Sequence, residues 1–389
     1  MGLLPRTGSH FGSRTSLAWR NLVHRRWRTV AALAGVGFTI LLLFMQIGFY
    51  DACVVSATRV HEMLEFDAVV VSTHYVFLLQ PGSFPDGRLA LARSAPGVAS
   101  AEPLLVGRAP WRNAATGNFY DVLAIGVAPD HDLFRDPSRN GALERLSSPL
   151  HAVVDRAGKP ILGPLEVGTR SELRDQRLEV VADFEHGTGF VANGTVLVNP
   201  ATFRRVFPEA AGRTAHLGLI SYHHGSDPER TLAEIARRLP EDVVALSRAQ
   251  LERRDRRFYL SDRPLGLIFT SGVAMALGVG ALVLFQILAS DISHHLGEFA
   301  TLKAIGYRTT ALRLQVLEQG ALFGLLGFVP AALLAALLYA LTSRVAGLPL
   351  AMSPGRLLLV LGLTLAMCGA SALLAIRRLE RADPAELFP

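Results

Sequence analysis

The sequence has little lysine and little cysteine. Lys159 and Lys303 are the only lysines, and Cys53 and Cys368 are the only cysteines. Cysteines in separate apolar runs form neither a disulfide framework nor a metal site. Neither lysine lies in the P-loop motif G-x-x-x-x-G-K-[ST], so the chain does not hydrolyse ATP at a P-loop site. The motifs H-E-x-x-H, C-x-x-C and G-x-S-x-G are also missing, which leaves no recognisable zinc protease, dithiol or serine hydrolase site.

Charge is scarce as well. Only 19% of the 389 residues are charged and half are hydrophobic, whereas a soluble enzyme has nearer a quarter charged. The net charge of +6 does not indicate a nucleic-acid partner, because the positive residues lie at the ends of apolar runs rather than in one basic patch. The composition therefore predicts membrane spans together with a polar domain.

Four stretches contain no charged residue: 29–50, 264–290, 319–343 and 357–376. A helix needs roughly 20 apolar residues to cross a hydrocarbon core of about 30 Å, so we expect four transmembrane helices. The first stretch lies too far from the N-terminus and is too long for a cleavable signal peptide. The lack of ionisable residues inside the stretches argues against a proton-driven carrier.

The distribution of arginine orients these spans. Residues 1–28 hold six arginines and no acid, and the tail 377–389 holds three more. Loop 291–318 is more basic than loop 344–356, so the positive-inside rule places both termini in the cytoplasm. The arginines at 253–263 oppose the rule, but they close a long domain, and long domains translocate largely regardless of charge.

Residues 51–263 are expected to form an external α+β domain. Strand-like runs occur at 66–73, 119–127, 177–184 and 194–199, and helical patterns occur at 86–94, 200–207 and 228–239. The two ends, 51–64 and 247–260, look like helical continuations of the spans and would form a stalk. His223, His224 and the Asp130–Asp132 stretch are taken as loop residues, and no metal site is assigned.

Three local motifs now add a resemblance. The stretch LAWRNLVHRRWRTVAALAGV (17–36), the stretch GEFATLKAIGYRTTALRLQVLEQGALFGLLG (297–327) and the end ALLAIRRLERADPAELF (372–388) resemble permeases of the MacB/FtsX superfamily. The long stretch 263–307, and VVSTHYVFLLQPGSFP at 70–85, are similar to the DevC-type branch of that superfamily. The resemblance implies four transmembrane helices with a large periplasmic α+β domain inserted between helices 1 and 2.

The resemblance also implies a function and partners. DevC-like proteins are homodimeric permease subunits of ABC exporters in the bacterial inner membrane. ATP and Mg bind to a separate ABC ATPase subunit, and no cofactor is expected on this chain. A periplasmic membrane-fusion adaptor connects such permeases to an outer-membrane channel, and membrane lipids surround the spans. Members work by mechanotransmission and expel a lipid, glycolipid or other amphiphile from the periplasm or outer leaflet.

Two sets of residues are predicted to matter for this function. Loop 291–318 would contain a coupling helix whose apolar spacing fits a groove on the ATPase, with Phe299, Leu302 and Ile305 as anchors. Glu298 would meet an arginine of the ATPase, and Gly306 would end the helix. The full coupling set is His294, Glu298, Phe299, Leu302, Lys303, Ile305, Gly306 and Tyr307. The membrane-surface anchors of the N-terminal amphipathic helix are Trp19, Arg20, Arg25, Arg26, Trp27 and Arg28.

Two alternatives remain open at this point. One is an FtsX-like mechanical regulator of a periplasmic cell-wall enzyme, although such regulators tend to have smaller external domains. The other is a lipoprotein-release permease without an outer-membrane channel. The coupling segment itself could be a surface helix that merely connects two spans, since both kinds of helix share one pattern.

Overall fold

The computed structural model describes residues 26–130, 132–187, 189–210, 212–262, 265–294 and 309–381. These residues divide into two compact units. The helical unit lies within Met1–Phe49, Ile268–Ala340 and Ala351–Pro389, and the external unit lies within Tyr50–Leu267 and Leu341–Leu350.

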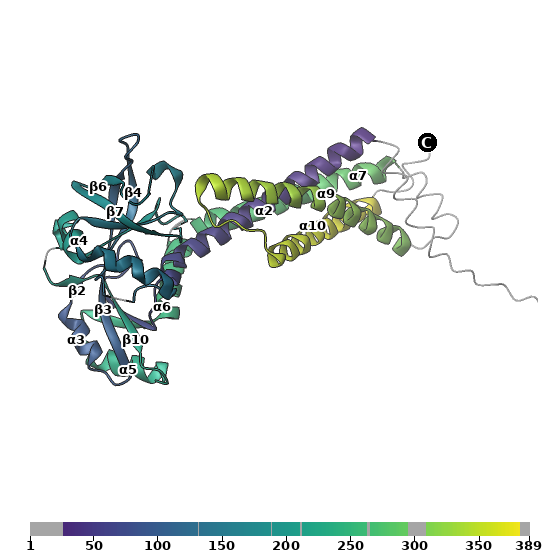
Figure 1. The fold of residues 1–389 in the computed structure, drawn as a ribbon. Coiled ribbons are helices and arrows are strands. Elements are labelled where there is room, and N and C mark those ends of the chain that lie inside the picture. The colour runs from purple at the N-terminus through teal and green to yellow at the C-terminus, as the bar shows by residue number, and fades with distance from the viewer. Residues whose placement is uncertain are drawn as a thin grey trace, which may run out of the picture. The chain divides into compact units, whose positions relative to one another are not determined.

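Four helices are long and apolar enough to cross a membrane. They are α2 (Arg26–Met63), α7 (Leu265–His294), α9 (Thr309–Ala346) and α10 (Pro354–Arg381), and they are labelled in Figure 1. The predicted set of four apolar helices, with an α+β domain between the first and the second, is confirmed. Each helix extends beyond its charge-free stretch, so parts of the predicted loop 291–318 are helical.

The first helix does not stop at the end of its apolar run. Residues 51–63 contain neither proline nor glycine, and the backbone stays helical to Met63. The helical continuation expected for 51–64 is therefore confirmed. It brings Val60, Met63 and the following Leu64 into the core of the external unit, where each is almost fully buried.

The external unit contains a nine-stranded sheet with the order β11-β1-β10-β3-β4-β8-β5-β7-β6. Its strands are β1 (Ala68–Ser72), β3 (Val98–Arg112), β4 (Phe119–Gly126), β5 (His151–Asp155), β6 (Arg170–Leu173), β7 (Gln176–Phe184), β8 (Thr195–Val198), β10 (Leu217–Tyr222) and β11 (Val243–Ser247). A separate pair joins β2 (Phe84–Pro85) to β9 (Thr214–Ala215).

One half of the sheet has a ferredoxin-like topology. The chain order β1-α3-β3 and then β10-α5-β11 gives two split βαβ units, and the four strands lie in the antiparallel order β11-β1-β10-β3. Helices α3 (Gly87–Arg93) and α5 (Pro228–Arg238) contact each other on this half (Figure 1).

Strand β1 shows why both faces of this half are covered. Its side chains alternate, so Ala68 and Val70 join the core beneath α3 and α5, whereas Val69 and Val71 join the opposite core. That opposite core includes Leu64 after α2 and Leu251 of α6. All five residues of β1 are buried, as expected for a strand with apolar packing on both sides.

The other half of the sheet begins on the same strand. The 15-residue strand β3 pairs with β10 up to Leu104 and with β4 from Leu105 onward. A further pairing of Trp111 with Leu173 joins β3 to β6, so the strands β3-β4-β8-β5-β7-β6 close into a ring. Strand β3 therefore connects the two halves of the unit.

The predicted helices and strands of this domain are largely confirmed. Pro228 occupies the first turn of α5 after Asp227, whose carboxylate accepts from the amides of Glu229 and Arg230. Helix α4 (Pro200–Val206) begins in the same way after Asn199. One correction concerns 247–260: helix α6 (Arg248–Arg257) ends early, and η4 (Phe258–Asp262) is a π-helical turn.

Candidate functional site

The predicted coupling residues lie almost entirely outside the described residues. Glu298, Phe299, Leu302, Lys303, Ile305, Gly306 and Tyr307 fall there, as do Trp19, Arg20 and Arg25 of the surface helix. His294 is the last residue of α7, and Arg26, Trp27 and Arg28 form the first turn of α2. These assignments remain predictions.

The two helices that flank the coupling segment are joined by a hydrogen bond. Gln319 of α9 donates from Nε2 to Oδ2 of Asp291 in α7 at 2.6 Å. A bond to a carboxylate is stronger than one between neutral groups, particularly where both side chains are partly buried. This bond therefore joins α7 to α9 near the end of one helix and the start of the other.

Small residues allow α7 to approach its neighbours closely. A Cβ on Gly272 would lie 2.5 Å from Gln46 of α2, and a Cβ on Gly280 would lie 2.4 Å from both Thr39 and Met367. Ala276, midway between these two glycines, is also buried. These small residues thus form a packing face toward α2 and α10.

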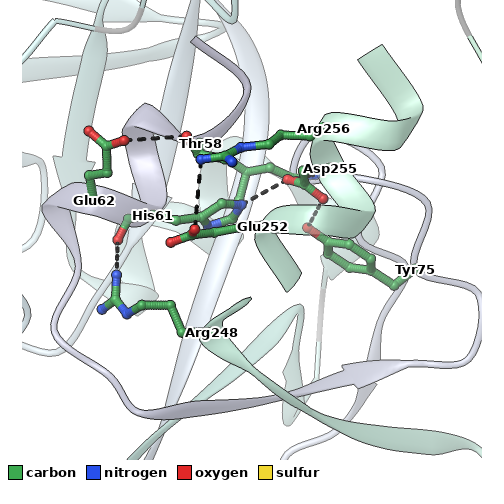
Figure 2. A network of polar contacts seen from close by, with 9 residues as sticks. Thr58, His61, Glu62, Tyr75, Arg248, Glu252, Asp255 and Arg256 are labelled. Carbon is green, nitrogen blue, oxygen red and sulfur yellow. Dashed lines mark hydrogen bonds and ion pairs between the residues drawn. The ribbon is translucent and has the colours of Figure 1, made fainter. Parts of the chain in front are cut away.

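The external unit contains a buried polar centre, which we call the Asp255 cluster: Asp255, His61, Tyr75 and Leu78. Figure 2 shows Asp255 between His61 and Tyr75. Oδ2 of Asp255 lies 2.8 Å from Nε2 of His61, and Oδ1 accepts from the Tyr75 hydroxyl at 2.8 Å. The Leu78 amide also donates to Oδ2 at 3.3 Å. The carboxylate thus collects three donors from two segments of the chain, α2 and the stretch after β1.

The geometry defines the state of each group in the Asp255 cluster. Nδ1 of His61 is buried and has no hydrogen-bond partner among the described residues, so a doubly protonated ring would bury an unpaired donor. This favours the tautomer in which Nε2–H donates to Asp255. Burial raises the pKa of the Tyr75 phenol well above its usual 10, and the Asp255 charge and hydrogen bond raise it further, so Tyr75 remains a neutral donor.

Arg248, the first residue of α6, caps the C-terminal end of α2. Its guanidinium donates to the carbonyl oxygens of His61 at 2.8 Å, Leu64 at 2.6 Å and Phe66 at 3.1 Å. The guanidinium also lies over the Phe66 ring, 3.9 Å from its centroid. Carbonyls at a helix C-terminus lack intrahelical partners. Arg248 bonds one carbonyl of the last turn of α2 and two carbonyls just after it, and so ties this end of α2 to α6.

A second buried carboxylate lies near Arg59, two residues before His61 on α2; we call Asp155, Arg59, His186 and Gly187 the Asp155 cluster. Asp155 accepts from the amides of His186 at 2.9 Å and Gly187 at 2.7 Å. Arg59 of α2 donates to the carbonyl of His186 at 2.6 Å, and His186 Nε2 lies 2.6 Å from the Arg59 carbonyl. The loop after β7 is thereby bound to both β5 and α2.

The loop that follows α9 packs onto the same region. A Cβ on Gly189, whose φ of +60° suits glycine, would lie 3.4 Å from Pro349 and 2.1 Å from the Ser56 hydroxyl oxygen. Leu348 and Leu350 are buried. The segment 347–350 therefore contacts the loop after β7, which is hydrogen-bonded to Ser56 and Arg59 of α2.

Two hollows of the external unit are lined in part by charged side chains. Two open hollows of about 520 and 630 Å³ lie beside the β6–β7 hairpin. Their shared wall includes Glu172, which pairs with Arg112 at 3.2 Å and Arg177 at 3.3 Å. No group of three or more His, Cys, Asp or Glu that could hold a metal occurs in the described part of the chain.

The C-terminal helices of the chain match a known protein family. Residues 270–384, which include most of α7 and all of α9 and α10, match the family model described as FtsX-like permease C-terminal. This part of the chain is similar to the C-terminal region of FtsX-like permeases. A comparison with curated proteins gives no match.

Solved structures similar to the chain cover about half of it. One is the periplasmic region of MacB from Actinobacillus actinomycetemcomitans, with 7% identity, a TM-score of 0.34, and coverage of 50% of this chain and 94% of that one. Another is the extracellular domain of the noncanonic ABC-type transporter YknZ from Gram-positive bacteria, with 13% identity, a TM-score of 0.33, and coverage of 47% and 99%.

The polar clusters of the external unit were not predicted from the sequence. Asp255 is the only acid in the run RRDRRF (253–258) of the predicted stalk helix, and that isolation was a usable signal. Tyr75 lies in the stretch 70–85, but the sequence pattern did not indicate a role for it. The partners of Asp155 come from β5, α2 and the loop after β7, and no local pattern links them.

Proposed function

We propose that this chain is the DevC-type permease subunit of an ATP-driven ABC exporter of the MacB/FtsX superfamily. The observation that carries the proposal is the FtsX-like permease match at 270–384, in a chain with four apolar helices and a large α+β domain after the first. In this role the chain transmits motion to the external domain rather than forming a pore. The four apolar stretches contain no Asp, Glu, Lys or Arg. This supports the proposed mode, because a proton-driven carrier places ionisable residues along its pathway.

The energy source in this proposal is a separate ABC ATPase that binds ATP and Mg. The chain has no P-loop, so it needs an external motor. The coupling residues are Glu298, Phe299, Leu302 and Ile305, with His294, Lys303, Gly306 and Tyr307 beside them. The hydrogen bond between Asp291 and Gln319 supports this assignment, since a joined pair of helices can pass on a push received by the segment between them.

The remaining partners follow from the same proposal. Two copies of the chain lie in the bacterial inner membrane, with both termini in the cytoplasm and the large domain in the periplasm. A periplasmic adaptor connects the dimer to an outer-membrane channel, and the cargo is a lipid, glycolipid or other amphiphile. The size of the external domain favours this function over an FtsX-like regulator, for which a smaller domain is expected.

Co-purification of the tagged full chain from native membranes tests the proposal. The expected result is an ABC ATPase subunit, with a membrane-fusion adaptor as a further component. The double variant Phe299→Asp, Leu302→Asp should lose the ATPase while still inserting in the membrane, because two carboxylates cannot enter an apolar groove unpaired. Thr301→Asp, in the same segment but outside the apolar spacing, is the matched control.

Two results would contradict the proposal. If the wild-type chain co-purifies with a cell-wall hydrolase and no channel-linked adaptor, the regulator function replaces the exporter. If the Phe299, Leu302 double variant assembles with the ATPase as well as the Thr301 variant does, the coupling face lies elsewhere.

A further inference from the structure

We propose that Asp255 is a positioning residue that makes the end of α2, the segment 73–80 and α6 move as one body when the exporter works. The inference rests on the proposed function and names the residues within the external unit through which motion is passed. It concerns the two stretches of chain that enter and leave the large domain, α2 and α6.

Asp255 is the point at which three segments meet. Its side chain is fully buried, and so is that of His61, which belongs to α2. Tyr75 and Leu78 belong to the stretch that follows β1. Removal of this one carboxylate would break every hydrogen bond by which it joins α6 to α2 and to the segment 73–80.

Two other acids nearby make their contacts within one helix. Figure 2 shows Glu62 bonded to Thr58 and Glu252 paired with Arg256, and each pair lies within a single helix. Pairs of this kind contribute little to stability, and these contacts do not join one element to another. Asp255 is thus set apart by burial and by contacts that cross between elements.

The segment 73–80 also holds the turn that follows α6. Phe77 stacks on Phe258 with the ring centroids 4.0 Å apart, and Tyr259 meets Phe77 edge-on at 5.5 Å. Phe258 and Tyr259 lie in the π-helical turn η4, the last described stretch before α7. π-helical turns occur frequently at functional sites. Here the turn packs on one side against the segment 73–80, which Asp255 positions.

Packing alone does not account for a carboxylate at this place. A buried charge is costly to desolvate, and replacing a whole buried polar cluster by apolar residues of similar volume is often neutral or stabilising. What the carboxylate adds is direction, because its two oxygens fix one face of α6 toward His61 and Tyr75. Without it, Arg248 would still tie the start of α6 to the end of α2, but the rest of α6 would follow α2 and the segment 73–80 less closely.

The first measurement asks whether Asp255 joins the segments. The full chain in lipid nanodiscs is studied by hydrogen exchange, and Asp255→Asn is compared with Glu252→Gln on the same helix. Asp255→Asn should accelerate exchange in 73–80 and 248–262 about ten- to hundredfold, since charge-assisted bonds hold these segments closed. Glu252→Gln should leave both segments unchanged. Tyr75→Phe, which removes one hydroxyl and keeps the ring, should give a smaller acceleration confined to the same segments.

The second measurement asks whether this junction passes on motion. In the complex with its ATPase, addition of ATP should change hydrogen exchange in the wild-type external domain. Asp255→Asn should reduce that change several-fold while basal ATP hydrolysis and assembly remain normal. Asp255→Glu, which retains the charge, should restore part of the response.

Each outcome is decisive. Unchanged exchange in Asp255→Asn overturns the junction. Faster exchange with an ATP response of wild-type size shows a purely structural contact and overturns the positioning role. A wild-type complex with no ATP response in its external domain counts against the proposed function itself and removes the positioning role, whatever the exchange of the variants.

Discussion

Asp155 and Asp255 each solve the same chemical problem with different donors. Both carboxylates are almost fully buried, and a buried carboxylate without donors is strongly destabilising. Asp155 is satisfied by three main-chain amides, those of Ala157, His186 and Gly187, whereas Asp255 relies mainly on two side chains. Side-chain donors can be changed one at a time, which makes the Asp255 cluster the more accessible of the two to mutation.

The Asp155 cluster should make the external unit sensitive to acid. Burial lowers the pKa of His186 below its ordinary 6.5, and the positive charge of Arg59 lowers it further. The hydrogen bond to the Arg59 carbonyl and the negative charge of Asp155 raise the pKa, but the net direction is downward. The unfolded chain therefore binds this proton at a higher pH than the folded chain. The stability that neutral His186 provides is complete above about pH 6.5 and is lost as the pH falls toward the folded pKa.

Thermal unfolding of the full chain in nanodiscs, measured between about pH 5 and pH 7, checks this expectation. His186→Gln should flatten the pH dependence of the melting temperature, because glutamine can donate to the Arg59 carbonyl without titrating. The exposed His224→Gln is the control and should keep the wild-type profile. Identical slopes for His186→Gln and wild type would contradict the assignment.

At the level of single residues, the sequence predicted sites that depend on local spacing and missed those that depend on folding. The anchors Phe299, Leu302 and Ile305 follow from a spacing of three. The contact between His61 and Asp255 joins residues 194 positions apart. Such a contact requires the fold of the whole domain, so no window of sequence contains it.

Helix α7 shows how one element meets two different environments. Gly272, Ala276 and Gly280 form its packing face, while Met275 and Val279 are exposed, as suits a lipid-facing side. The two faces follow from the helical period alone. Sequence could propose the small-residue face but could not tell packing from ordinary lipid exposure, because that choice depends on the neighbouring helices.

Gly280→Ala should destabilise the helical unit. The new Cβ would lie 2.4 Å from the Cγ2 of Thr39, which is buried and bonded to the Gly35 carbonyl at 3.0 Å, so the neighbour cannot move freely. Overpacking of this kind costs about 1–3 kcal/mol. Thermal unfolding in mild detergent should show a lower transition temperature for this variant.

Gly278→Ala is the matched control for that experiment. It lies two residues away on the same helix, and a Cβ there would meet nothing within 4 Å. Alanine is the better helix former by about 1 kcal/mol, so this variant should be neutral or slightly stabilising. Equal losses for the two variants would mean that the Gly280 contact is not a packing contact.

Strand β3 is the longest of several strands that the sequence did not predict, together with β5, β6, β10 and β11. Its 15 residues include Pro103 and Pro110, and proline within an apolar run argues against a strand because it cannot donate to a ladder. The strand also changes partner midway, from β10 to β4, so its buried positions follow no single alternation. Strands β1, β4, β7 and β8 were predicted correctly.

At the scale of the whole molecule, the chain contributes to the external unit in two stretches. One is Tyr50–Leu267, from the end of α2 to the start of α7, and the other is Leu341–Leu350, the end of α9 and the residues after it. Successive spanning helices alternate in direction, so a loop that packs with the large domain lies on the same side of a membrane as that domain. The segment 295–308 and both termini are then expected on the opposite side, as the arginine distribution predicts.

Cysteine labelling in intact cells tests this topology. In a background with the buried Cys53 and Cys368 replaced by alanine, Pro160→Cys should react with a membrane-impermeant maleimide that reaches the periplasm, because residue 160 is exposed on the external unit. Gly347→Cys, in the loop between α9 and α10, should react from the same side, whereas Ala382→Cys in the C-terminal tail should react only after the inner membrane is permeabilised. Labelling of residue 382 before permeabilisation, with residue 160 protected, would invert the orientation and remove the coupling segment from the side where ATP is available.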